Sequence, residues 1–268
     1  MLTNESPRMR AMILAAGLGT RLRPLTDNRP KALVELSGRT LLEITLTRLR
    51  TFGITEVIVN VHHFADMVID HLKSNNNFGM RIEISREEVL LDTGGGLKKA
   101  AWFFLENSAH RNSSQTDEPF LLHNVDVISN IDLRRMLQFH TENQALATLA
   151  VQSRETSRYL LFDDHLQLCG RRMEGHSSLV TRHSPLPEAP EPSSLQPLAF
   201  SGIHVISPRL LPRLTEEGVF SIIDSYFRLA AQGQPILAFR ADQYYWRDLG
   251  RPADLVQAAL DLQQNVFL

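Results

Sequence analysis

The chain has 268 residues, of which 43% are hydrophobic, and its formal net charge is -2. This length and composition predict one large globular unit with a substantial core, and the slightly acidic charge argues against a nucleic-acid partner. Cys169 is the one cysteine, which excludes an intrachain disulfide and a cysteine-rich zinc site. The apolar stretches are too short for a membrane span and the first ten residues are polar. We therefore expect neither a membrane partner nor a signal peptide, and a cytoplasmic location.

Strand-like and helix-like segments alternate along residues 11–152. Buried strands are predicted at residues 11–15, 56–61, 81–85, 120–124 and 145–152, and helices at residues 40–52, 64–73, 94–105 and 133–141. The alternation predicts an α/β fold, Rossmann-like, with a mostly parallel mixed sheet and helices on both faces. Ligands bind at the carboxyl ends of such strands. We therefore expect the loop after residue 15, Asn60 and Asp126 to converge on one edge.

The second half of the chain is less regular. It predicts a hairpin at residues 159–169, strands at residues 200–206, 236–240 and 244–247, and helices at residues 222–232 and 252–264. Residues 176–197 hold five of the thirteen prolines and many serines. This composition is typical of an irregular loop, which we interpret as a lid or a subunit contact.

A glycine-rich run follows the first strand. Residues 14–26 read Leu-Ala-Ala-Gly-Leu-Gly-Thr-Arg-Leu-Arg-Pro-Leu-Thr, and Pro30-Lys31 come shortly after. Glycines let several backbone N–H groups approach a ligand, and arginine and lysine add positive charge, so the run predicts a polyphosphate-binding loop. Leu22 stands where a dinucleotide-binding motif has its third glycine, and the Walker lysine is missing, which argues against both of those motifs.

This run, together with Pro-Lys-Ala-Leu-Val at residues 30–34, resembles the signature of sugar-1-phosphate nucleotidyltransferases. Asp-Thr-Gly-Gly-Gly at residues 92–96 and Trp-Arg-Asp-Leu-Gly at residues 246–250 extend the resemblance, which is greatest to short bacterial members. It implies one domain over residues 1–268, with a nucleotide-binding half (1–150), a sugar-binding half (151–268) and no β-helix domain. The implied reaction couples a nucleoside triphosphate to a sugar 1-phosphate and releases pyrophosphate.

The resemblance also assigns roles to residues. Arg21, Lys31 and Asp126 would be catalytic, and Asp126 and Asp248 would hold Mg²⁺, which prefers carboxylate and phosphate oxygens. The expected nucleotide contacts are Leu14, Ala15, Ala16, Gly17, Gly19, Thr20, Arg21, Lys31, Thr93 and Gly94. The expected substrate contacts are Asn124, Glu174 and Gly202.

Several assignments stay open. Asn60 either contacts the base or caps the sheet. Structural alternatives are a surface lysine for Lys31, a helix cap for Asp126 and a turn residue for Asp248. The family usually has glycine where Val125 precedes Asp126. Its usual glutamate-lysine pair is not evident either, so Arg171 or Arg172 is a candidate partner for the sugar phosphate.

Alternative functions remain at this point. A neighbouring branch with the same loop transfers cytidylyl groups to phosphocholine. A regulatory subunit that binds nucleotide sugars without catalysis is another alternative, although retention of Asp126 and Asp248 argues against it. Uridylyl and guanylyl transfer are the favoured reactions. The sugar and a homo-oligomeric state cannot be read from the residues.

Overall fold

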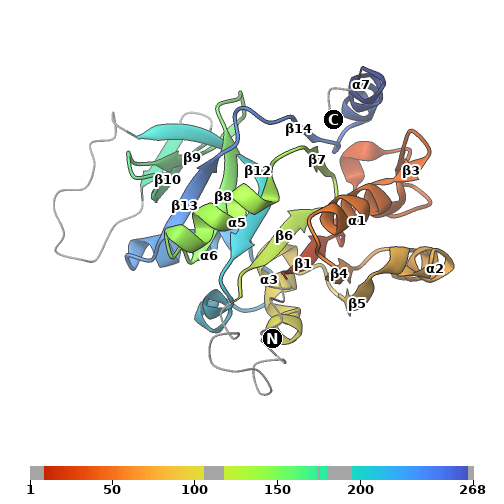
Figure 1. Ribbon diagram of the computed structural model, residues 1–268, viewed down its shortest axis with the longest axis horizontal. Helices are drawn as coiled ribbons and strands as arrows, with labels where there is room; N and C mark the ends of the chain where they lie inside the picture. The colour runs from red at the N-terminus through yellow and green to blue at the C-terminus, as the bar shows by residue number, and fades with distance from the viewer. Residues whose placement is uncertain (1–8, 106–117, 174–175, 180–194, 265–268) are drawn as a thin grey trace, which may run out of the picture.

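A computed structural model describes residues 9–105, 118–173, 176–179 and 195–264. A ten-stranded mixed sheet runs through these residues in the order β11-β10-β9-β12-β6-β1-β4-β5, with β8 paired to β12 and β13 (Figure 1). The strands are β1 Arg10–Leu14, β4 Glu56–Val61, β5 Arg81–Arg86, β6 Phe120–Asn124, β8 Ala147–Gln152, β9 Arg158–Phe162, β10 Leu168–Met173, β11 His176–Leu179, β12 Gln196–Ile206 and β13 Ile236–Arg240. The expected mixed α/β sheet is confirmed.

Strand direction changes across the sheet. β1 pairs in parallel with β4 and β6, and β4 pairs in parallel with β5. β12 is antiparallel to β6, β8 and β9, whereas β13 is parallel to β8. Because β12 pairs with β6, one sheet joins the N-terminal and C-terminal halves of the chain.

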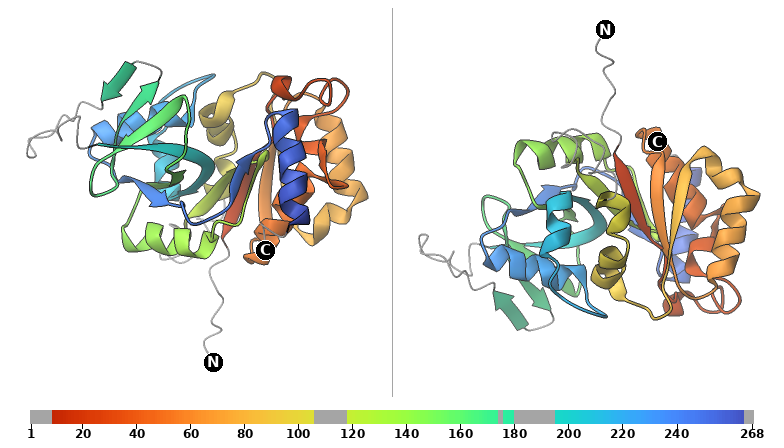
Figure 2. Two further views of the ribbon diagram at one scale, coloured as in Figure 1. Left: turned by 90° about the horizontal axis from the view of Figure 1, so that it is seen from above. Right: turned by 90° about the horizontal axis from the view of Figure 1, so that it is seen from below.

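Helices cover both faces of the sheet (Figure 2). Met12 and Ile13 are adjacent in β1 and are fully buried in different apolar clusters, as strand alternation requires. The Ile13 cluster includes residues of α1 Leu41–Thr51, α2 Ala65–Ser74, α5 Leu133–Glu142 and α7 Pro252–Gln263. The Met12 cluster includes residues of α3 Asp92–Lys99, α4 Trp102–Leu105 and α6 Ile222–Ala231.

Side-chain caps fix where several helices begin. The Thr40 hydroxyl accepts a hydrogen bond from the Glu43 N–H at the start of α1, and Asp132 accepts from Arg134 and Arg135 at the start of α5. Such caps satisfy N–H groups that have no partner within the helix. Within the described residues, no helix has the length and apolar character of a membrane span.

The structure corrects three expectations. The helix expected from residue 94 begins at Asp92 and is interrupted after Lys99, so α3 and α4 are separate. Residues 176–197 are not one irregular loop, because residues 176–179 form β11 and β12 begins at residue 196; residues 180–194 lie outside the described chain. The strand expected at residues 244–247 is β14 Trp246–Asp248, which pairs with a short strand that was not expected, β7 Val127–Ser129.

Candidate functional site

A cavity of about 420 Å³ opens where β1, β4 and β6 end. Leu14 at the end of β1 lies in register with Asn60 of β4 and with Asn124 of β6, and all three line the cavity. The lining residues are Leu14, Ala16, Gly17, Arg21, Lys31, Asn60, Glu87, Leu90, Asp92, Thr93, Asn124, Val125, Asp126, Val219 and Asp248. The expected convergence of the glycine-rich loop, Asn60 and Asp126 on one sheet edge is confirmed.

The loop after β1 folds back through Gly19, which has a left-handed backbone with φ of 66°. A Cβ atom at Gly19 would lie 2.9 Å from Thr26 Cγ2 and 3.1 Å from Lys31 Cβ, and the Thr26 hydroxyl donates to Gly19 O over 2.9 Å. Glycine is therefore required both for the turn and for close packing. Arg21 and Lys31 line the cavity, whereas Gly19 does not line it and packs against Thr26 and Lys31.

Two carboxylates meet at the cavity through the β7–β14 pair. Val127 is in register with Asp248, and the Leu249 N–H donates to Asp126 O over 2.7 Å. Asp248 Oδ1 accepts from the Gly250 N–H over 2.6 Å. A Cβ atom at Gly250 would lie 2.5 Å from Asp248 Oδ1 and 2.6 Å from Arg21 Nη2, so this glycine leaves room for both side chains.

Charges of both signs are concentrated around this carboxylate pair. Lys31 Nζ donates to Asp126 Oδ2, and the two side chains are 13% and 11% exposed. Burial raises the pKa of Asp248, the Asp126 charge raises it further, and Lys31 and Arg21 lower it. The site therefore holds two partly desolvated carboxylates beside two cationic side chains.

This arrangement fits a divalent cation held together with a phosphate ligand. A cation between Asp126 and Asp248 would relieve the repulsion that raises the Asp248 pKa. Mg²⁺ is usually bound by one or two carboxylates, with water and substrate phosphates completing its shell. Groups of three or more histidine, cysteine, aspartate or glutamate ligands are absent from the described residues, so the remaining ligands would be substrate oxygens and water.

A buried amide–carboxylate pair, Asn60 and Glu87, also lines the cavity. Asn60 Oδ1 accepts from the Ala15 N–H over 2.7 Å, and Asn60 Nδ2 donates to Glu87 Oε1 over 2.7 Å. Glu87 is 2% exposed, and its second oxygen accepts from the Leu91 N–H over 3.0 Å. Sequence reasoning missed Glu87, although its position directly after the carboxyl end of β5 was a usable signal. Asn60 thus both braces the loop and faces the cavity.

The three glycines of α3 are packing positions. A Cβ atom at Gly94 would lie 2.3 Å from the Phe220 ring, and one at Gly95 would lie 2.5 Å from Gly218 O. The Gly94 N–H donates to Phe220 O over 3.0 Å, so it is not directed at a ligand. Thr93 does line the cavity, and its hydroxyl also accepts from the Ile222 N–H.

The residues expected on the sugar side are only partly brought together. Gly202 has a φ of 72°, and a Cβ atom there would lie 2.8 Å from Nδ2 of Asn124, a cavity residue. Glu174 lies outside the described residues. Arg171 pairs with Asp224 over 3.3 Å, and Arg172 lies over the Tyr159 ring; neither lines the cavity.

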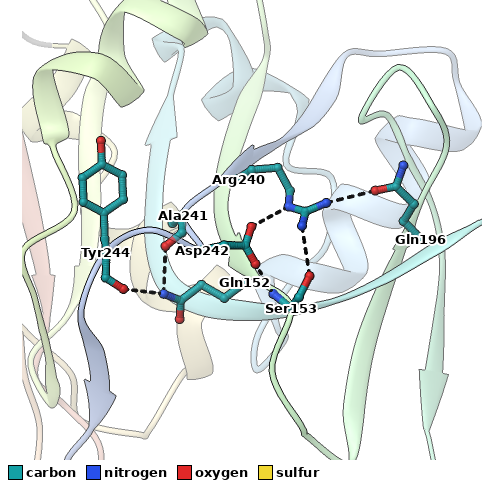
Figure 3. A network of polar contacts seen from close by, with 7 residues as sticks. All are labelled: Gln152, Ser153, Gln196, Arg240, Ala241, Asp242 and Tyr244. Carbon is teal, nitrogen blue, oxygen red and sulfur yellow. Dashed lines mark hydrogen bonds and ion pairs between the residues drawn. The ribbon is translucent and has the colours of Figure 1, made fainter.

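A polar network anchors the segment that leads into β14 (Figure 3). Gln152 Nε2 donates to Ala241 O over 2.8 Å and to Tyr244 O over 2.9 Å, and Asp242 Oδ1 accepts from the Ser153 N–H over 2.6 Å. A surrounding set of bonds runs from Arg240 to Asp242, Gln196 and Ser153. This network fixes the chain between β13 and β14, and with it the strand that carries Asp248.

Fold and site together define a phosphate-handling α/β protein, and comparison with known proteins identifies its class. The model of the nucleotidyl transferase family matches residues 10–265, so the chain belongs to that family. An N-acetylmuramate alpha-1-phosphate uridylyltransferase of Caulobacter vibrioides is 32% identical over 93% of this chain and 94% of its own. A mannose-1-phosphate guanyltransferase beta-B of Xenopus laevis is 30% identical over 96% of this chain and 66% of its own.

Solved structures support the fold. A putative glucose-1-phosphate thymidylyltransferase from Bacillus anthracis superposes with a TM-score of 0.73 at 17% identity, and the match covers 96% of each chain. At this identity the likeness concerns the fold alone. The family match and the curated relatives confirm the resemblance to sugar-1-phosphate nucleotidyltransferases, and the solved structure confirms the expected fold class.

Proposed function

We propose that the cavity transfers a uridylyl group from UTP to a sugar 1-phosphate, giving a nucleotide sugar and pyrophosphate. The observation that carries the proposal is the meeting of Arg21 and Lys31 with Asp126 and Asp248 in one cavity. Two anions must approach each other in this reaction, so a site that neutralises charge and fixes orientation accounts for most of the required catalysis.

Each side chain has a definite role in the proposal. Arg21 and Lys31 bind the triphosphate, and Lys31 offsets the charge that develops at the α-phosphate while a sugar-phosphate oxygen attacks the phosphorus and pyrophosphate leaves. The Lys31–Asp126 ion pair holds the ammonium in place before substrate binds. The low exposure of Lys31 strengthens its attraction to a phosphate relative to that of a lysine at the surface.

Asp126 and Asp248 are the proposed Mg²⁺ ligands. When bound, the metal would neutralise and orient phosphate oxygens. Asn60, Glu87 and Thr93 line the end of the cavity that we assign to the base and ribose. Uridylyl transfer to an N-acetylmuramate-type sugar is favoured because the relative so named matches along nearly its whole length.

A matrix of activities tests the proposal. Pyrophosphate release is measured for UTP, GTP, CTP and dTTP, each with N-acetylmuramate, N-acetylglucosamine, mannose and glucose 1-phosphates and with phosphocholine, with Mg²⁺ or with EDTA. We expect the highest kcat/KM for UTP with an N-acetylated sugar and loss of activity in EDTA. A preference for GTP would overturn the base assignment. No turnover with any pair would favour a nucleotide-sugar-binding subunit, and turnover confined to CTP and phosphocholine would favour that branch.

A further inference from the structure

Arg154 lies shortly after β8, and several of its N–H groups have no hydrogen-bond partner among the described residues. Its guanidinium stacks on Trp246, with Cζ 3.7 Å from the ring centroid. Nη2 donates to Phe200 O over 2.6 Å, and Nε is buried without a hydrogen-bond partner among the described residues. A guanidinium carries five N–H groups, and the two on Nη1 have no hydrogen-bond partner among the described residues, so they are the donors left for a ligand.

The Arg154–Trp246 pair lies beside Asp248, which lines the cavity, while Arg154 and Trp246 stand behind the lining residues. Trp246 and Asp248 are two positions apart in β14, so their side chains leave the same side of the strand, and Asp248 lines the cavity. Burial lowers the pKa of Arg154, and the nearby Asp248 carboxylate raises it. Trp246 Nε1 donates to Ser201 O, next to Gly202, which lies against Asn124. Arg154 is therefore a neighbour of Asp248, and the ring on which it stacks is bonded to the segment that packs against Asn124.

We propose that Arg154, held flat on Trp246, binds an oxyanion of the sugar substrate. The oxyanion is either the phosphate that every sugar 1-phosphate carries or a carboxylate that an acidic sugar carries. A planar, partly desolvated guanidinium suits either group, because two of its parallel N–H groups match two oxygens. The inference rests on the proposed function. It favours Arg154 over Arg171 and Arg172, because Arg154 interacts with Asp248, which lines the cavity, whereas Asp224 and Tyr159, the contacts of the other two arginines, do not line it.

The test is Arg154→Gln, with Arg134→Gln as the matched control, since Arg134 also lies over an aromatic ring, that of Phe52, and neither residue lines the cavity. Titration calorimetry without nucleotide measures the Kd of N-acetylglucosamine 1-phosphate and of N-acetylmuramate 1-phosphate, which differ by a carboxylate-bearing ether. We expect the Arg154 variant to bind about 10- to 100-fold more weakly, with the Kd of UTP unchanged. Weaker binding of both sugars identifies the phosphate as ligand, and weaker binding of the acidic sugar alone identifies the carboxylate.

Unchanged binding of both sugars, or an equal loss of UTP affinity, overturns the inference. Arg154→Lys guards against a variant that fails to fold: it keeps the charge but loses the planar pair of donors, so an intermediate Kd is expected. The KM for the sugar, with kcat measured in parallel, gives a second readout. If the protein turns over its substrates but binds the sugar equally well without Arg154, this inference is refuted and the proposed function stands. If sugar binding depends on Arg154 but no nucleotide–sugar pair is turned over, the proposed function is refuted and this inference stands.

Discussion

At the scale of single residues, we expect the largest effect on turnover from a substitution in the Lys31–Asp126 pair. Asp126→Asn removes the negative charge of this side chain. That charge positions Lys31, and in the proposed function it would also hold the metal. We expect kcat to fall about 100- to 1,000-fold, the range seen when one preorganised electrostatic contact is lost. Turnover and its Mg²⁺ dependence are measured together with thermal unfolding, and the fold should persist because Asn is nearly isosteric.

Asp132→Asn is the matched control for this change. Asp132 caps α5 outside the cavity, and asparagine caps helices about as well as aspartate. Wild-type turnover is therefore expected for the control. An Asp126 variant that kept its full activity would remove that carboxylate from the reaction.

The ionised side chain of Asp248 lowers the stability of the folded chain by an amount that depends on pH. Because burial and Asp126 raise its pKa in the folded chain above the usual 3.8, the folded state binds this proton more tightly than the unfolded state. The free energy of unfolding should therefore fall as pH rises from about 3.8 through the raised value, and the penalty should persist at neutral pH.

Asp248→Asn should therefore unfold at a higher temperature than the wild type at pH 7 in metal-free buffer, and its activity should be lost. The gain should shrink as the pH falls through the raised folded-state pKa and should vanish below about 3.8, where the wild-type carboxyl is protonated in both states. Calorimetric scans at pH 7 and below pH 3.8 measure it. A variant less stable than the wild type at neutral pH would contradict this sign.

The sequence predicted site residues unequally, for physical reasons. Arg21 and Lys31 were predictable because they occupy fixed positions in a long signature loop whose glycine turns determine where they point. Glu87 was missed because an isolated glutamate resembles a surface residue until its burial against Asn60 is seen. Arg154 was missed because its environment comes from Trp246, a distant residue on another strand.

At the scale of elements, α3 shows how packing glycines support the site. Gly95→Ala would place a methyl group 2.5 Å from the backbone oxygen of Gly218, which cannot move aside as a side chain can. Overpacking of this kind costs roughly 1–3 kcal/mol. Because Val219 lines the cavity, the KM of a substrate should rise as well. Urea unfolding and steady-state kinetics measure both effects.

Lys99→Ala serves as control for the α3 variant, because Lys99 is exposed on the same helix. A small change in stability and an unaltered KM are expected for it. If Gly95→Ala were as stable as the wild type, the close packing of α3 on residues 218–222 would be refuted.

Two of the misread regions, the start of β12 and the β7–β14 pair, share one cause: their conformation depends on distant partners. Pro197 suggested a loop, yet it lies at the second position of β12, in register with Leu161, where a missing N–H group is tolerated. β7 and β14 have three residues each, too few for a periodic signal, and exist because they pair with each other. This pairing brings Asp126 and Asp248 together. The local sequence pattern around either residue does not indicate the pairing, so the family resemblance alone predicted that the two carboxylates meet.

At the scale of the whole molecule, the cavity lies where the parallel and mixed parts of the sheet meet. β1, β4 and β6 present the loop, Asn60 and Asn124, whereas β14 presents Asp248 from the C-terminal half. A ligand that contacts both halves should therefore stabilise the chain as one unit. This gives a test of base preference that needs no turnover.

UTP with Mg²⁺ should raise the melting temperature more than GTP, CTP or dTTP at equal concentration. A ligand at about 100 times its Kd stabilises the folded state by about 2.7 kcal/mol, which corresponds to roughly 5–10 °C for a chain of this size. The part of the shift that needs Mg²⁺ should disappear in Asp126→Asn, whereas Asp132→Asn should retain it. Differential scanning fluorimetry over a concentration series measures these shifts. Equal shifts for all four nucleotides would show that the cavity recognises the triphosphate and not the base, and would leave the proposed uridylyl specificity without support.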